Sequence, residues 1–243
     1  MPLLEAENLS KQFRGLCAVR DLSFTVNEGM IFGLIGPNGS GKTTLFNLIT
    51  GFLKPDTGRI RFNGRDITGT ASYAICKTGI SRTFQLNKLF SSMTVLENVM
   101  VGRIYGSEPA WNLRQVRVES EELLELVGLN KKRLVISGAL GVVERRKLEV
   151  ARALATKPRL LLLDEMMAGL NLREIEDAMC LVEGIRNSGV TVIIVEHVMK
   201  AILGISDRVM VLSAGDKIAE GTPGEIVHNK KVIEAYLGEE HDA

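Results

Sequence analysis

The stretch MIFGLIGPNGSGKTT, from Met30 to Thr44, decides the fold because it joins an apolar run to a glycine-rich turn. The run from Met30 to Ile35 is apolar without alternation, as expected of a strand covered on both faces. Residues Gly41 to Ile49 have the character of the helix that follows such a strand. Between them, Gly36 to Thr43 match the pattern G-x-x-x-x-G-K-[ST], which predicts a phosphate-binding loop.

Each part of this loop has a physical reason to hold phosphate. Gly39 and Gly41 have no Cβ, so their backbone N–H groups can approach an anion, and the helix N-terminus adds a favourable dipole. Lys42 would bridge the β- and γ-phosphates, and the Thr43 hydroxyl would bind Mg²⁺. The predicted nucleotide-binding residues of the loop are Gly36, Pro37, Asn38, Gly39, Ser40, Gly41, Lys42, Thr43 and Thr44.

A second buried strand, Leu160 to Leu163, ends in the two carboxylates Asp164 and Glu165. Open α/β sheets bind their ligands at the carboxyl ends of strands. Beside a phosphate loop, Asp164 suits the Mg²⁺ shell, and Glu165 suits the base that positions an attacking water. The simpler alternative is a strand that ends in an ordinary helix N-cap.

Two further patterns frame these motifs. In the first 65 residues, apolar and polar side chains alternate from Leu22 to Val26 and from Arg59 to Phe62, which predicts half-buried strands, and Asn63-Gly64 predicts a hairpin turn. After Pro158, short apolar runs alternate with amphipathic stretches, as in a parallel sheet covered by helices. These runs span residues 160–163, 192–195 and 209–212.

From about residue 86 to 152, helical signals replace the strand signals. Thr94-x-x-Glu97 is a capping box, and helices are expected over Glu119–Val127 and Arg145–Ala155. The fold class predicted is therefore α/β: a phosphate-loop NTPase core with a parallel sheet, an N-terminal antiparallel β subdomain and an inserted helical subdomain. The core with its antiparallel subdomain would take residues 1–85 and 153–243, and the helical subdomain residues 86–152.

The composition excludes several function classes. Lys and Arg number 30 and Asp and Glu 29, so no overall field attracts nucleic acid. No secretory signal is visible, and no apolar run approaches the roughly 18 residues of a membrane-spanning helix. Cys17, Cys76 and Cys180 are far apart without metal-ligand spacing, which predicts small buried residues in a reducing cytosol. Work at a membrane would therefore require a partner.

The order of the motifs resembles the ATP-binding cassette ATPases over nearly the whole chain. The resemblance rests on the phosphate loop, on Gln85 in Ser-Arg-Thr-Phe-Gln, on the Asp164-Glu165 strand end and on His197 after the strand 192–195. It implies ATP and Mg²⁺ as cofactors, Phe13 stacking on adenine, and a loop at 168–171 that crosses to a second subunit. The implied catalytic residues are Glu165, His197 and Gln85, and the implied Mg²⁺ ligands are Thr43, Gln85 and Asp164.

Each of these residues also has an ordinary interpretation when it is taken alone. Phe13 can be a core residue, Gln85 a solvated loop residue and His197 a histidine at a strand end. Their joint order favours the functional interpretation.

Four segments resemble the cassettes of branched-chain amino-acid importers more specifically. They cover residues 79–85, 90–98, 195–200 and 232–238. Urea, amide and lipopolysaccharide systems share much of this pattern, so they stay open as alternatives. The resemblance implies a peripheral subunit on the cytoplasmic face of the inner membrane, with integral-membrane permease subunits, a second cassette ATPase and, indirectly, a substrate-binding protein as partners, and no nucleic acid.

One segment departs from the family pattern. Where the family has Leu-Ser-Gly-Gly-Gln, which caps the γ-phosphate on the opposite subunit, this chain has Leu140-Gly-Val-Val-Glu144. The serine hydroxyl is missing, and Val143 replaces a glycine that would let backbone approach phosphate. We expect a heterodimer with one strong and one weak site, although a homodimer that tolerates the change is also consistent. Met166, where proline is usual, is a lesser departure that affects only the expected loop geometry after Glu165.

Two other function classes agree less well with the sequence. A weakly hydrolysing regulatory module would explain the altered signature segment, but intact Glu165 and His197 disfavour it. A soluble cassette acting on DNA or ribosomes usually carries tandem cassettes or long coiled insertions, and this sequence has neither.

Overall fold

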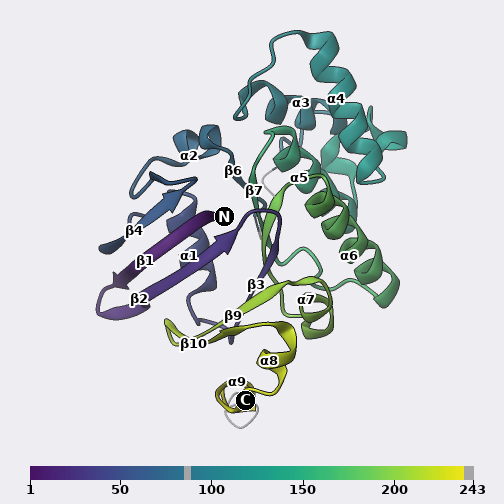
Figure 1. The fold of residues 1–243 in the computed structure, drawn as a ribbon. Coiled ribbons are helices and arrows are strands. Elements are labelled where there is room, and N and C mark those ends of the chain that lie inside the picture. The colour runs from purple at the N-terminus through teal and green to yellow at the C-terminus, as the bar shows by residue number, and fades with distance from the viewer. Residues whose placement is uncertain (85–88, 238–243) are drawn as a thin grey trace. The chain divides into compact units, whose positions relative to one another are not determined.

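The structure, a computed structural model, describes residues 1–84 and 89–237. The chain divides into two units, one formed by Met1–Ser72 with Thr191–Ala243 and the other by Tyr73–Val190 (Figure 1). The segment 86–152, predicted as an inserted helical subdomain, falls inside the second unit. That unit also takes in residues 73–85 and 153–190, which the prediction assigned to the core.

An antiparallel sheet begins the first unit, in the order β2 (Leu16–Asn27), β1 (Pro2–Phe13), β4 (Thr57–Phe62) and β5 (Arg65–Asp66). Ala6 of β1 is paired with a residue of β2 on one side and of β4 on the other. The alternation read from the sequence is visible in β2, where buried residues alternate with more exposed ones along its second half. The turn between β4 and β5 is Asn63-Gly64, with positive φ at both residues, as the hairpin motif predicts.

The first unit also holds a mainly parallel set of strands around β3 (Ile31–Ile35). This strand pairs in parallel with β8 (Thr191–Val195) and β9 (Arg208–Ser213), and β10 (Asp216–Gly221) pairs antiparallel with β9. Every residue of β3 and β8 is buried, which confirms the doubly covered strand predicted from the apolar run. The helices of this unit are α1 (Lys42–Ile49), α7 (Met199–Ile205), α8 (Pro223–Val227) and α9 (Lys230–Leu237).

In the second unit, two short parallel strands meet a group of helices. Strand β6 (Ile80–Arg82) pairs with the buried strand β7 (Leu160–Asp164). The helices are α2 (Ser72–Thr78), α3 (Val95–Tyr105), α4 (Leu113–Leu126), α5 (Val142–Ala155) and α6 (Leu172–Asn187), with short 3₁₀ turns at Asn130–Lys132 and Ser137–Ala139. Helices α3, α4 and α5 pack against one another (Figure 1).

Helix α3 shows how local sequence positions this group. The predicted capping box is present, because the Glu97 N–H donates to the Thr94 hydroxyl at 3.2 Å and the Thr94 N–H donates to the Glu97 carboxylate at 2.7 Å. On its inner face, Gly102 lies so close to α5 that a Cβ there would be 2.4 Å from the Arg152 carbonyl oxygen. A glycine is therefore required for α3 and α5 to approach this closely.

Several local expectations were wrong. Helix α4 begins at Leu113 rather than at Glu119, because the Asn112 side chain accepts hydrogen bonds from two backbone N–H groups of the first turn. Helix α5 begins at Val142 rather than at Arg145. Helix α2 and the three-residue strand β6 were not foreseen, since elements this short give little periodic signal.

The cysteines are also more exposed than expected. Cys17 and Cys76 are half-buried and Cys180, on α6, is exposed, so none is a fully buried core residue. Within the described residues no disulfide forms, and partial burial raises the pKa of the Cys76 thiol. Among the helices of the described residues, none has the length and apolar character needed to cross a membrane.

Candidate nucleotide-binding site

The phosphate loop closes around the ammonium group of its own lysine. Lys42 is 6% exposed, and its Nζ donates hydrogen bonds to the Gly36 carbonyl oxygen at 2.7 Å and to the Pro37 carbonyl oxygen at 2.8 Å. The Ser40 hydroxyl lies 3.5 Å from the same nitrogen. These contacts hold a positive charge inside the loop, where the phosphates of a nucleotide would need it.

Two glycines of the loop are required by close contacts with neighbouring strands. A Cβ at Gly36 would lie 2.1 Å from the Leu212 carbonyl oxygen, and a Cβ at Gly41 would lie 2.2 Å from the Ala18 carbonyl oxygen. Gly39 differs, because it has φ of 75° but open space around the Cβ position. The loop therefore needs glycine at 36 and 41 for fit, and at 39 for backbone conformation.

Helix α1 begins at Lys42, in the last residues of the loop and one residue after the predicted start at Gly41, and its N-terminus is suited to an anion. No acidic residue lies in its first turn, and Gly41, which precedes it, provides no side-chain cap. The dipole and backbone N–H groups of the first turn can therefore act on a bound phosphate. Asn38 and Thr43 are exposed, and Thr44 is half-buried.

The first unit carries two more of the predicted site residues. His197 follows β8 by two positions and is exposed, and Phe13, the last residue of β1, is 41% exposed. The Lys11 ammonium lies 5.7 Å from the centroid of the Phe13 ring. Because Phe13 is this exposed, it is not part of the core, and a planar ligand can stack on its ring. Gln85 lies outside the described residues.

The predicted carboxylates lie in the second unit at the end of β7. The Asp164 side chain is 3% exposed and forms an ion pair with Arg82, whose nitrogen is 3.1 Å from the carboxylate oxygen. The Asp164 N–H donates to the Thr83 hydroxyl at 3.1 Å. Burial lowers the pKa of Arg82, and the Asp164 carboxylate acts in the opposite direction.

Arg82 is a site residue that the sequence did not predict. Within the motif Ser-Arg-Thr-Phe-Gln, only Gln85 was expected to have a role, and nothing in the spacing shows that Arg82 would meet Asp164, which is 82 positions away. A charged residue between the apolar Ile80 and Phe84 was the one available signal.

Glu165 adopts an unusual backbone conformation. Its φ of 51° lies in the left-handed region, which non-glycine residues rarely occupy, and its side chain is half-buried. The following loop is held by Arg146, whose guanidinium donates to the carbonyl oxygens of Met166, at 3.4 Å, and Ala168. Backbone strain of this kind clusters at functional sites. Met166, the departure from proline, is itself buried at 7% exposure.

The family model described as "ABC transporter" matches residues 19–168, a segment that includes the phosphate loop and both carboxylates. The chain belongs to the ABC transporter family. Membership makes this cassette an ATP-binding ATPase, with the α/β fold of the family. A second model, described as "Branched-chain amino acid ATP-binding cassette transporter", matches residues 217–242 of the cassette.

Curated relatives are similar to the cassette over nearly its whole length. The high-affinity branched-chain amino acid transport ATP-binding protein BraF of Pseudomonas aeruginosa is 40% identical, and LivG of Salmonella typhimurium is 41% identical, with 98% of each chain covered. The lipopolysaccharide export system ATP-binding protein LptB of Haemophilus influenzae is 36% identical, with 99% of each chain covered.

Among solved structures, the ADP conformation of an ATP-binding cassette of an ABC transporter matches with a TM-score of 0.88 and 34% identity. The match covers 98% of this chain and 99% of that one.

The altered signature segment of the cassette forms the start of α5. The Glu144 carboxylate accepts a hydrogen bond from the Gly141 N–H at 3.2 Å and pairs with Lys132 at 2.5 Å. The hydrogen bond and charge of Lys132 lower the pKa of Glu144. The Gly141 N–H of this helix start is therefore already used internally, which reduces what it can offer a phosphate on an opposite subunit.

Proposed function

We propose that this cassette is the ATP-hydrolysing subunit of a membrane importer for branched-chain or related amino acids, acting peripherally at the cytoplasmic face of the inner membrane. The observation that carries the proposal is the phosphate loop closed around Lys42, in a chain 40% identical over 98% of its length to a branched-chain amino acid transport ATP-binding protein. The separate match of residues 217–242 supports the amino-acid class.

Nucleotide binding would begin with an exchange of partners at Lys42. Its ammonium, now bound to the carbonyl oxygens of Gly36 and Pro37, would turn to the β- and γ-phosphates, which are better acceptors because they carry charge. The N-terminus of α1 would bind the same phosphates, and Phe13 would stack on adenine.

Hydrolysis would depend on oxygen ligands and on a positioned water. The Thr43 hydroxyl and the Asp164 carboxylate are hard oxygen donors of the kind Mg²⁺ prefers, and Gln85 would be a further ligand. When bound, Mg²⁺ neutralises charge on the β- and γ-phosphates. Glu165 would orient the attacking water, and His197 would hold the γ-phosphate.

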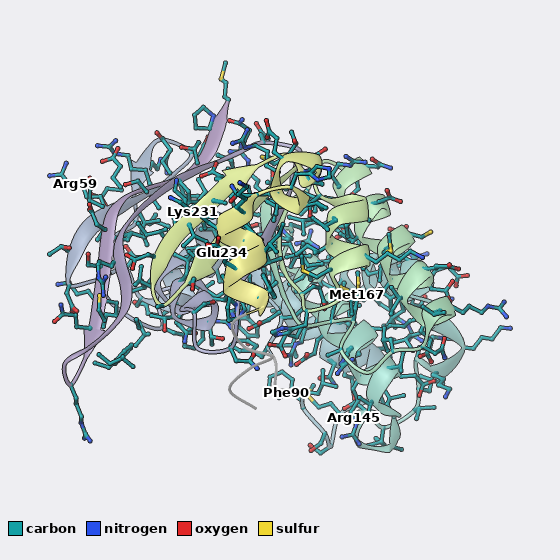
Figure 2. The ribbon with its side chains drawn as sticks, turned by 90° about the horizontal axis from the view of Figure 1, so that it is seen from below. Arg59, Phe90, Arg145, Met167, Lys231 and Glu234 are labelled. Atoms are coloured by element: carbon teal, nitrogen blue, oxygen red, sulfur yellow. The ribbon has the colours of Figure 1, made fainter. Side chains whose placement is uncertain are left out.

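A groove in the second unit fits a permease subunit. A cavity of about 320 Å³ lies beside α3 and α5, and its lining includes Phe84, Phe90 and Tyr105. Phe90, which is labelled in Figure 2, is 46% exposed, and Tyr105 is 65% exposed. Exposed aromatic side chains around a hollow are typical of protein interfaces. By the resemblance to the family, the segment at Gln85 would transmit closure of the cassettes to the permease.

The second cassette would be a different chain. The weakened segment from Leu140 to Glu144 would face the partner's nucleotide, whereas the intact loop and carboxylates of this chain would face a complete signature. This arrangement gives one strong and one weak site. The same segment favours a second candidate function, a weakly hydrolysing regulatory module. The greater identity to BraF and LivG than to LptB argues against a lipopolysaccharide system.

The test is Mg-ATP hydrolysis by the purified chain, alone and mixed with its copurifying cassette partner, with Glu165→Gln as the control. We expect activity to appear or rise with the partner and to be lost with Glu165→Gln in this chain. If wild type and variant are equally silent in every mixture, the regulatory function replaces the proposed one.

A further inference from the structure

Arg82 pairs with Asp164, the last residue of β7. We propose that Arg82 is a positioning residue that competes with Mg²⁺ for the Asp164 carboxylate. The inference rests on the proposed function, because it takes Mg-ATP as the ligand of the cassette.

The contacts of Arg82 make it an internal counter-ion. Its side chain is 6% exposed, and its guanidinium lies 3.1 Å from the Asp164 carboxylate and 4.7 Å from the centroid of the Phe84 ring. The neighbouring residue Thr83 binds the backbone of β7 on both sides of Leu163, through hydrogen bonds with Leu162 at 2.9 Å and Asp164 at 3.1 Å. Because the backbone next to Arg82 is hydrogen-bonded to β7, the Arg82 side chain is fixed beside Asp164.

Mg²⁺ would meet this ion pair when it binds. A carboxylate with so little solvent access is stabilised by its partner, and removing either partner leaves a buried charge. A divalent cation bound to the same carboxylate would repel the guanidinium at short range in a poorly hydrated site. Mg²⁺ held by Asp164 would therefore weaken the contact between Arg82 and Asp164, and part of the Mg²⁺ binding free energy would be used for that change.

A second arginine lies in the same part of the second unit. Arg82 lines the 320 Å³ cavity together with Glu149 and Arg152. Glu149 is 4% exposed, and its charge interacts with Arg152. Arg152 is therefore a cation of the same cavity that can serve as a control for Arg82.

The experiment measures how much Mg²⁺ is needed to tighten nucleotide binding. A fluorescent ATP analogue is titrated into the full-length chain, first in EDTA and then over a range of Mg²⁺ concentrations. Arg82→Met removes the charge but keeps an unbranched side chain. Arg152→Met is the matched control, because Arg152 lines the same cavity and its guanidinium lies over the Phe90 ring at 5.5 Å.

We expect Arg82→Met to lower the Mg²⁺ concentration for half-maximal tightening by about tenfold or more, from the strength of a charged hydrogen bond. Arg152→Met should leave it within about twofold of wild type, and affinity in EDTA should be unchanged in both variants. Thermal unfolding supplies an independent readout: Arg82→Met should be less stable than wild type without ligand and gain more from Mg-ATP.

The proposal is overturned if Arg82→Met has the wild-type Mg²⁺ requirement or a higher one, or if Arg152→Met shifts it equally. Should Arg82→Met fail to fold, Arg82→Lys provides the test with a weaker single-point contact, and it should still lower the requirement. Adding Asp164→Asn to the Arg82 variant should abolish the shift. Failure of the wild-type chain to bind the analogue at all would instead contradict the proposed function.

Discussion

Replacing Gly41 with alanine tests whether contact with β2 shapes the phosphate loop. A Cβ at position 41 would lie 2.2 Å from the Ala18 carbonyl oxygen, whereas one at Gly39 would meet no atom within 4 Å. Both glycines have positive φ, 105° and 75°, so either substitution costs about 1–2 kcal/mol in backbone strain. Only Gly41→Ala adds a clash, which costs about another 1–3 kcal/mol because the loop or strand must shift.

The assay is urea unfolding followed by circular dichroism. The free energy of unfolding should fall by about 2–5 kcal/mol for Gly41→Ala and by about 1–2 kcal/mol for Gly39→Ala. Nucleotide affinity should fall in both, and Gly39→Ala should lose affinity with the smaller loss of stability because no atom lies within 4 Å of its Cβ position. Equal losses of stability in the two variants would refute the idea that packing against Ala18 requires the glycine at 41.

Three further predictions concern charge and the signature segment. A hydrogen bond from Arg103 lowers the pKa of Glu119 from 4.5 to about 2. The contribution of this pair to the free energy of unfolding is therefore present above pH 4.5 and lost as pH falls toward 2. Glu119→Gln should remove about 1 kcal/mol of the pH dependence of the unfolding free energy in acid unfolding curves, a figure reduced to allow for solvent screening. Lys42→Ala should weaken binding of the ATP analogue by about tenfold or more in fluorescence titration, and equal affinities would contradict the loop geometry. The double variant Gly141→Ser with Val143→Gly should raise ATP turnover of the mixed cassettes by about tenfold, because it restores the missing hydroxyl and glycine. The serine fits, since a Cβ at position 141 has its nearest atom at 3.9 Å. Unchanged turnover would mean that this segment does not limit the partner's site.

Much of the fold follows from local pattern. The apolar run before the phosphate loop became the buried strand β3, and Thr94 with Glu97 became the start of α3. These signals are strong because each depends on residues close in sequence, where periodicity and capping act directly. The start of α4 was placed too late, since its cap is Asn112 and its first turn carries few apolar residues.

The part of the site that was missed depends on contacts between distant residues. Arg82 and Asp164 are 82 positions apart and meet because β6 and β7 pair in parallel. Strand β6 has three residues, too few for an alternating pattern to be recognised. The left-handed backbone at Glu165 was also invisible, because the residue type gives no sign of positive φ.

The most direct test of the central claim is ATP-driven uptake of radiolabelled leucine into proteoliposomes that contain this cassette, its partner cassette, the permease subunits and the binding protein. The account predicts uptake that requires ATP on the cassette side and that is abolished by Glu165→Gln in this chain. Continued uptake with Glu165→Gln, or ATP hydrolysis by the complete assembly without uptake of leucine or a related amino acid, would contradict it.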